Sequence, residues 1–240
     1  MGISRYLAMT EAEMAAFSLE TDEKPAFMAC HFSPYGTGLS NFPTFLPPDS
    51  MLILNDRTPI CGHDPQRIAE EVTQVVERFA CECVLLDFER ADFPETRALC
   101  QLLASHISCP VGVAEGYGKD LSCPVFLPPM PLDVSLEEYL SPWKGREVWL
   151  DIAPNAACVS ITREGSTYTP LPDSFPQADA FEDKALHCYY KAEIKEDRID
   201  FYLWRNWKSQ ILEAERLGVT KCVGLYQQLK AFPFGEGGRA

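Results

Sequence analysis

The sequence has few basic residues to offer an anionic partner. Its 240 residues include 21 Lys and Arg against 35 Asp and Glu, which gives a formal net charge of -14. Nucleic-acid binding depends on Lys and Arg side chains that neutralise phosphates, so this balance argues against nucleic acid and against anionic membrane surfaces. No apolar run approaches the roughly 18 residues that a membrane span needs. The charge favours a neutral or cationic small molecule as partner.

Several familiar site signatures are also missing. The ten cysteines are scattered rather than paired at the Cys-x-x-Cys spacing of a zinc site, so we expect neither a metal nor another cofactor. No glycine-rich loop leads from a strand into a helix, and no Gly-x-Ser-x-Gly nucleophile elbow occurs. Glu11 and Glu13 interrupt any secretory leader early. We therefore expect a cytoplasmic protein with reduced cysteines.

What the chain does contain is an alternation of short apolar runs with amphipathic helices, the pattern of a parallel sheet. Helices are expected after Asp64 and from Pro94, after a capping box at Ser135 and Glu138, and over 204–217. The expected strands are 26–31, 51–54, 84–88, 111–114, 125–127, 148–152 and 221–226. The predicted fold class is a (β/α)8 TIM-type barrel, short or incomplete, whose eighth strand is hidden in the N-terminal third or missing.

One stretch departs from this alternation. Residues 157–203 form hairpin patterns around Glu164-Gly165 and around 195–198. We interpret the chain as a single barrel domain over 1–240, with a small β-rich insertion at about 156–203 before the last strand.

Polar residues gather where the apolar runs end. In a parallel barrel the active site lies at the C-terminal ends of the strands, so these residues are candidates for binding a substrate. Any strand that leaves a core must also become polar somewhere, so each residue alone is weak evidence. The candidate substrate-binding residues are His31, Asp56, Tyr117, Asp151, Tyr226 and Gln228.

Asp87 and Glu89 form a stronger signal, because side chains two apart on a strand point to the same face. If Leu85 lies inside the barrel, both carboxylates lie above it. Two carboxylates this close repel as anions, which raises the pKa of one of them. That arrangement suits Glu89 as a general acid with Asp87 sharing or orienting its proton. The alternative is that Glu89 pairs with Arg90 or Arg97 at the surface.

The run Val84-Leu-Leu-Asp-Phe-Glu89 resembles the fourth-strand motif of family 18 glycoside hydrolases, the chitinase-like barrels, which ends in Asp-x-Glu with the Glu as acid. Glu82 stands where the family has its first Asp, and Leu85 replaces the middle member of the carboxylate relay. Residues 200–226 resemble the family's run into strand eight, especially in spore-cortex-type members. Tyr226 falls where the family places an aromatic floor for the sugar, and the β-rich block lies where it places an insertion domain.

This resemblance implies a glycoside hydrolase-like protein that acts on a glycan or amino sugar, with Glu89 as general acid, Asp87 tuning it and Tyr226 packing under the sugar. The family's Tyr-Asp pair after strand six has no counterpart after 125–130. Together with Leu85, this leaves open a catalytically inactive chitinase-like protein that binds a sugar or another small ligand.

Glu115 offers another route to hydrolysis. It ends the next strand, and neighbouring strand ends can approach the separation of a two-carboxylate glycosidase site. With Glu89 as acid, Glu115 would be nucleophile or base, and the substrate would need no acetamido group. A barrel enzyme of unrelated chemistry that uses His31, Asp56 and Glu115 is a third alternative.

Overall fold

The computed structural model describes residues 2–17, 22–60, 62–90, 94–171 and 179–231. Within these residues, eight parallel strands form a closed barrel. At least half of the residues in every barrel strand are buried, as expected of strands covered on both faces. In order around the barrel, the strands are β1 (Ser4–Met9), β2 (Glu23–Phe32), β4 (Met51–Asn55), β5 (Cys83–Asp87), β6 (Val111–Ala114), β7 (Val125–Leu127), β8 (Val148–Asp151) and β14 (Lys221–Leu225), and β14 lies next to β1.

The chain divides into two compact units. The barrel unit consists of Met1–Pro128, Gly145–Asp151 and Val219–Val223. The insertion unit consists of Pro129–Lys144, Ile152–Gly218 and Gly224–Ala240.

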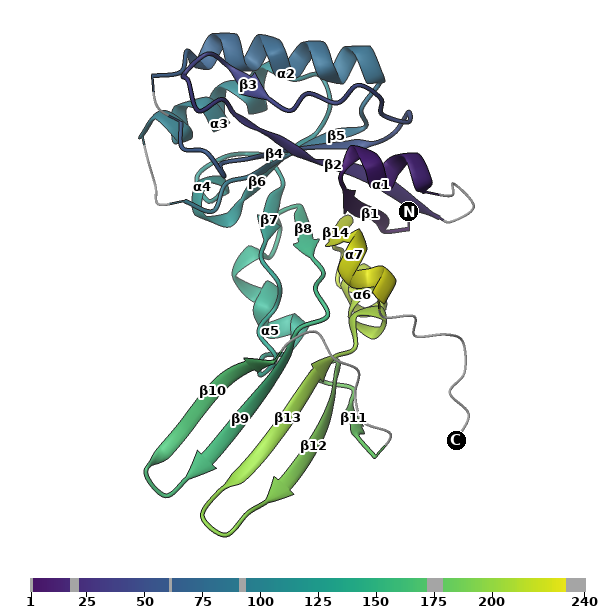
Figure 1. The fold of residues 1–240 in the computed structure, drawn as a ribbon, viewed down its shortest axis with the longest axis vertical. Coiled ribbons are helices and arrows are strands. Elements are labelled where there is room, and N and C mark those ends of the chain that lie inside the picture. Colours follow the sequence, from purple (N-terminus) through teal and green to yellow (C-terminus); the bar gives the residue numbers. More distant parts are fainter. Residues whose placement is uncertain (1, 18–21, 61, 91–93, 172–178, 232–240) are drawn as a thin grey trace. The chain divides into compact units, whose positions relative to one another are not determined.

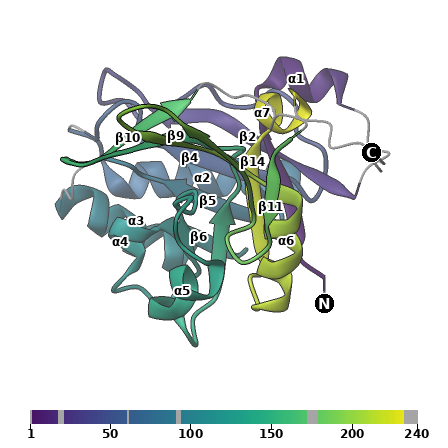
Figure 2. The same cartoon turned by 90° about the horizontal axis from the view of Figure 1, so that it is seen from below.

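Short helices connect most of the barrel strands. Between β2 and β4 the described chain instead carries the two-residue strand β3 (Leu39–Ser40), antiparallel to β2. Figures 1 and 2 show α3 and α4 close to β6, which they contact. None of the described helices is both long and apolar enough to cross a membrane. The helices of the barrel unit are α1 (Glu11–Ala16), α2 (Pro65–Phe79), α3 (Pro94–His106) and α4 (Glu115–Gly118).

The α2 helix shows how local sequence sets these boundaries. The Asp64 side chain accepts a hydrogen bond from the Gln66 N–H at 3.0 Å, and Pro65 occupies the first turn, where no backbone donor is needed. Ala80 ends the helix in the left-handed conformation, with φ of 51°. The helix buries one apolar stripe, which includes Ile68, Val72 and Val76. The expected helix after Asp64 is confirmed.

The barrel interior is filled by side chains from alternate strand positions. Trp149 is fully buried there, and a Cβ atom on Gly112 would lie 2.2 Å from its Cε3 atom. Gly112 therefore provides the space that the Trp149 ring occupies. The buried cluster comprises Tyr6, Ala8, Ala26, Met51, Ile53, Cys83, Leu85, Phe126, Trp149 and Val223.

The predicted fold class is confirmed, and the barrel is complete. The eighth strand is β1, which lies in the N-terminal third and pairs in parallel with β2. Counted from β1, β5 is the fourth barrel strand and β7 the sixth, which agrees with the strand numbers that the family resemblance implies.

A charged group lies at the N-terminal ends of the strands, opposite Asp87. Glu82, just before β5, accepts hydrogen bonds from the Tyr6 hydroxyl at 2.6 Å and from Lys24 Nζ at 2.5 Å. Lys221 lies over the rings of Tyr6 and Trp149, at 5.8 Å and 5.4 Å from their centroids. The carboxylate of Glu82 is thus held at the barrel floor, with Leu85 between it and Asp87 along the strand.

The insertion unit contains the predicted β-rich block, a five-stranded antiparallel sheet in the order β10, β9, β13, β12, β11 (Figure 1). Its strands are β9 (Ala156–Thr162), β10 (Gly165–Leu171), β11 (Phe181–Asp183), β12 (Cys188–Ile194) and β13 (Ile199–Arg205). The helices of this unit are α5 (Leu136–Leu140), η1 (Ser141–Trp143), α6 (Trp207–Arg216) and α7 (Tyr226–Ala231).

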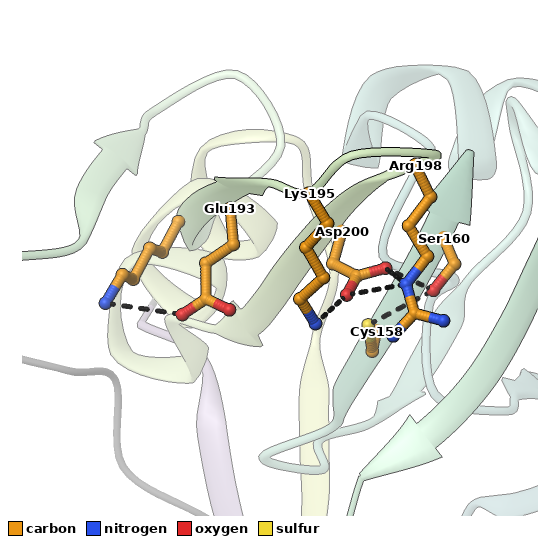
Figure 3. A network of polar contacts seen from close by, with 7 residues as sticks. Cys158, Ser160, Glu193, Lys195, Arg198 and Asp200 are labelled. Carbon is orange, nitrogen blue, oxygen red and sulfur yellow. Dashed lines mark hydrogen bonds and ion pairs between the residues drawn. The ribbon is translucent and has the colours of Figure 1, made fainter. Parts of the chain in front are cut away.

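Asp200 is the centre of a network of hydrogen bonds and ion pairs on this sheet. Its side chain, almost fully buried, accepts from the Ser160 hydroxyl at 2.6 Å on the paired strand and from Lys195 at 2.5 Å, while Arg198 lies at 3.1 Å (Figure 3). The hydrogen bond from Lys195 is the largest cause that lowers the pKa of Asp200 to about 2. Both cations come from the β12–β13 turn and its edge, so the network fixes that hairpin against β9.

The predicted helix over 204–217 is wrong at its start. Trp204 and Arg205 belong to β13, where Trp204 pairs with Ala156 of β9, and α6 begins only after its N-cap Asn206. The buried Arg205 guanidinium donates to three backbone carbonyls, which keeps this residue in the strand end. Those carbonyls belong to Met130, Pro131 and Leu186.

Substituting Gly112→Ala tests the packing of the barrel interior. The new methyl group would overlap the rigid Trp149 ring, and overpacking of this kind costs about 1–3 kcal/mol. We expect the free energy of unfolding, measured by urea titration, to fall by that amount. Gly116→Ala is the matched control, because a Cβ atom there meets nothing within 4 Å. An unchanged stability for Gly112→Ala would contradict the packing described above.

Candidate active site

The fourth barrel strand delivers a carboxyl group to the C-terminal end of the barrel. Asp87 is the last residue of β5, two positions after Leu85, which is buried in the interior cluster. The alternation of side chains along a strand therefore turns Asp87 inward above Leu85. Its register partner on β4 is Asn55, whose side-chain amide donates to the Met28 carbonyl at 2.9 Å.

The carboxyl group of Asp87 is shifted towards its protonated form. Burial is the main cause, followed by the negative charges of Glu89 and Asp56, and together they raise the pKa of Asp87 to about 6. The expected repulsion between residues 87 and 89 thus acts on Asp87. Near neutral pH this carboxyl group exchanges its proton readily.

Asp56 holds the backbone that follows β5. It comes directly after β4, and its buried carboxylate accepts hydrogen bonds from the N–H of Glu89 at 3.1 Å and of Arg90 at 2.9 Å. The Arg90 guanidinium donates in return to the carbonyls of Asp56 and Arg57, both at 2.7 Å. The loop after β4 and the loop after β5 are thereby joined, since each donates hydrogen bonds to acceptors in the other or accepts them.

Aromatic packing supports the same loop from α4. Tyr117 is buried, and its hydroxyl donates to the Arg90 carbonyl at 3.1 Å. Its ring meets the Phe88 ring edge to face at 6.1 Å between centroids, and Phe88 also contacts Phe32 at 5.5 Å. Phe88 points away from Asp87 by alternation, so it fixes the strand end without entering the barrel.

Glu89 itself is exposed. Within the described residues, its side-chain carboxylate makes no hydrogen bond or ion pair, and the Arg90 guanidinium donates to backbone carbonyls. Arg97 pairs with Asp120 at 2.9 Å. The described contacts of Arg90 and Arg97 thus go to backbone carbonyls and to Asp120.

The other predicted site residues fall into three groups. His31 and Asp151 are partly buried at the ends of β2 and β8, and the Nδ1 atom of His31 lies 3.0 Å from the Ala29 carbonyl oxygen. Glu115 is exposed at the start of α4, and it is not among the charges that act on Asp87. The insertion unit carries Tyr226 and Gln228, both in α7, so Tyr226 opens a helix and does not end the last strand.

Two of the predicted substrate contacts have a different environment from the one expected. Asp56 and Tyr117 are buried, and their recorded hydrogen bonds go to backbone groups of residues 89 and 90. They support the loop of Glu89, whereas the sequence analysis expected them at the surface of a binding site. The sequence signal for Asp56 was its place at a strand end, but its partner became visible only with the β4–β5 register.

Arg90 is a residue of this site that sequence reasoning considered only as a surface partner of Glu89. Its backbone and its guanidinium both take part in the loop that follows β5. In the part of the chain that the structure describes, no cluster of three or more His, Cys, Asp or Glu side chains could hold a metal ion.

No family model matches the chain, and no curated protein matches its sequence. Solved structures do match its fold. The spore cortex-lytic enzyme SleL of Bacillus cereus has a TM-score of 0.56 and 10% identity, over 93% of this chain and 70% of that chain. A mutant GH18 chitinase of Cycas revoluta in complex with (GlcNAc)4 has a TM-score of 0.54 and 11% identity, over 92% of this chain and 94% of that one.

The SleL enzyme of Bacillus megaterium QM B1551 is also similar, with a TM-score of 0.52 and 10% identity over 93% of this chain and 70% of its own. These likenesses cover nearly all of the chain at very low sequence identity, so they describe its fold. The chain has a divergent GH18-like fold, a (β/α)8 barrel with a β-rich insertion before the last strand.

Proposed function

We propose that the chain is a glycoside hydrolase-like protein that acts on a glycan or amino sugar, with Glu89 as its general acid. The observation that carries the proposal is the partly buried Asp87, with a pKa of about 6, beside the exposed Glu89 just after the fourth barrel strand. Titratable groups with shifted pKa values at the C-terminal end of a barrel are typical of active sites.

The proposed chemistry assigns different tasks to the two carboxyl groups. Glu89 protonates the glycosidic oxygen as the bond to the leaving sugar breaks. Asp87, while it keeps its own proton, donates a hydrogen bond that stabilises the carboxylate left on Glu89. Because the pKa of Asp87 is raised to about 6, this donor is present at mildly acidic pH and disappears as the pH rises further.

The nucleophile is proposed from the fold likeness. In the resembled family, the acetamido group of the substrate attacks the anomeric carbon in place of a second carboxylate. That mechanism suits an amino-sugar substrate. It needs only Glu89 as an enzyme acid and no second enzyme carboxylate.

A second candidate function is sugar binding without hydrolysis. Leu85 in the buried interior favours it, because it removes the middle carboxylate that would connect Asp87 to an acidic group deeper in the barrel. The sequence after β7 also lacks the Tyr-Asp pair that positions the acetamido group in the resembled family.

The first test compares wild type with Glu89→Gln on chitooligosaccharides and aryl glycosides. Loss of a general acid lowers rates by about 10²–10⁴-fold, so we expect a fall in kcat of at least about a hundredfold. Glu196→Gln makes the same chemical change in the exposed turn between β12 and β13, and should leave kcat unchanged. Turnover is measured by release of reducing ends or of the aryl group.

The outcomes of this test separate the candidates. If wild type hydrolyses nothing but binds chitooligosaccharides in calorimetry, the enzyme proposal is wrong and the binding function stands. If Glu115→Gln lowers kcat as strongly as Glu89→Gln, the site uses two enzyme carboxylates instead of the acetamido group. Absence of both hydrolysis and binding would overturn the two functions together.

The raised pKa of Asp87 also predicts a pH dependence of stability. The pKa is about 6 in the folded chain and about 4 in an unfolded one, so the folded state binds more protons between these values and loses stability as the pH rises through them. Asp87→Asn removes this loss. We expect the variant to be more stable than wild type at pH 7 by on the order of 2 kcal/mol, and the difference to vanish near pH 4.

Urea titrations at several pH values measure this difference. Asp197→Asn, in an exposed turn of the insertion unit, is the control and should show no such trend. A difference between Asp87→Asn and wild type that stays constant from pH 4 to pH 7 would show that the pKa of Asp87 is not raised.

A further inference from the structure

We infer that Asp56 is the positioning residue of this site: its carboxylate fixes the backbone that carries Glu89, and its charge acts on Asp87. A role of Asp56 in catalysis rests on the proposed function, whereas its effects on the backbone of Glu89 and on the charge around Asp87 do not. Asp56 itself is buried and its carboxylate is bound to the backbone, so it acts through the residues of β5 and the following loop.

The first effect depends on the carboxylate having two acceptor oxygens. Oδ1 accepts from the Glu89 N–H at 3.1 Å and Oδ2 from the Arg90 N–H at 2.9 Å. These two donors follow the end of β5, and the strand ladder recorded between β5 and β6 stops one residue before Asp87. Bonds from backbone N–H groups to an ionised acceptor are among the stronger hydrogen bonds. An amide side chain would offer only one acceptor to the two donors.

The second support is that hydrogen bonds also run back from Arg90 to the loop that carries Asp56. The Arg90 guanidinium returns to the Asp56 carbonyl and the Arg57 carbonyl, and the Tyr117 hydroxyl holds the Arg90 carbonyl. The loop after β4 and the loop after β5 are therefore bound to each other by several hydrogen bonds. The backbone of Glu89 is fixed while its side chain stays exposed and able to turn towards a substrate.

The third support is electrostatic. The charged groups that act on Asp87 are Glu89, two residues after it, and Asp56, directly after β4. The register neighbour on β4 is the neutral Asn55, and β6 ends in Ala114. The negative charge of Asp56 helps to raise the pKa of Asp87.

The test is Asp56→Asn, read out by the carboxyl carbon signal of Asp87 in a pH titration by nuclear magnetic resonance. Removing the charge lowers the pKa of Asp87, and we expect a fall of about half a unit below its wild-type value. Loosening the backbone of Glu89 lowers kcat about tenfold to a hundredfold with little change in KM, since misplacement of a catalytic group costs up to about 10²-fold. The alkaline limb of the pH–rate profile moves to lower pH.

Tyr117→Phe is the matched control. It removes one hydrogen bond from the same loop, that to the Arg90 carbonyl, and changes no charge near Asp87. A purely structural role for Asp56 would give both variants the same result, with kcat lowered and the titration of Asp87 unchanged. That result would overturn the electrostatic half of the inference, and an unchanged kcat and titration in Asp56→Asn would overturn all of it.

Failure of the proposed function gives a different pattern. If wild type has no hydrolytic activity, the titration of Asp87 still responds to Asp56→Asn, and the physical inference stands without a reaction. If Asp56→Asn does not fold, wild type alone decides. The amides of Glu89 and Arg90 should then be protected from hydrogen exchange by their bonds to Asp56, and rapid exchange of both would contradict the inference.

Discussion

Alternation of side chains along a strand in a closed barrel is the constraint on which this site depends. The same period of two that puts Leu85 into the filled interior turns Asp87 inward at the next level. The interior below is occupied, with Trp149 in the space that Gly112 leaves, so Asp87 rests on apolar side chains. Burial is accordingly the largest cause of its raised pKa, ahead of the charges nearby. The packing of the barrel interior thus contributes to the raised pKa of Asp87, the carboxyl group above it.

Much of the fold could be predicted from the sequence, because the barrel strands are short apolar runs and the helices have clear caps. The Asp64 cap and the strands 111–114 and 125–127 lie where predicted. The eighth strand was expected in the N-terminal third or missing, and its exact place, Ser4–Met9, was not predicted because this segment begins with polar residues and pairs with β14 near the other end of the chain. The start of α6 was wrong because Trp204 and Arg205 have good helical patterning but are fixed in β13 by cross-strand pairing and three backbone carbonyls.

In the candidate site, too, local patterns were predictable from the sequence and long-range contacts were not. The inward position of Asp87 follows from local alternation, so the sequence was sufficient for it. The arrangement of Asp56 depends on the register of β4 against β5 and on the path of the loop after β5, which no local pattern contains. Tyr117 follows a strand end, as a binding residue would, yet the turn into α4 buries it against Phe88. Position after a strand predicts nearness to the site, whereas the side-chain direction decides what the residue does there.

The distribution of acids along β5 limits how a proton could reach the site. Glu82 is bound to Tyr6 and Lys24 at the floor, and Leu85 and Cys83 occupy the inward positions between it and Asp87. An apolar side chain transmits no proton, so the two acidic groups are isolated from one another along the strand. Both carboxylate oxygens of Asp56 accept hydrogen bonds from backbone N–H groups, so they are occupied within the loop. The exposed carboxyl of Glu89, whose charge acts on Asp87, offers the proton of Asp87 a route to solvent that does not involve Glu82.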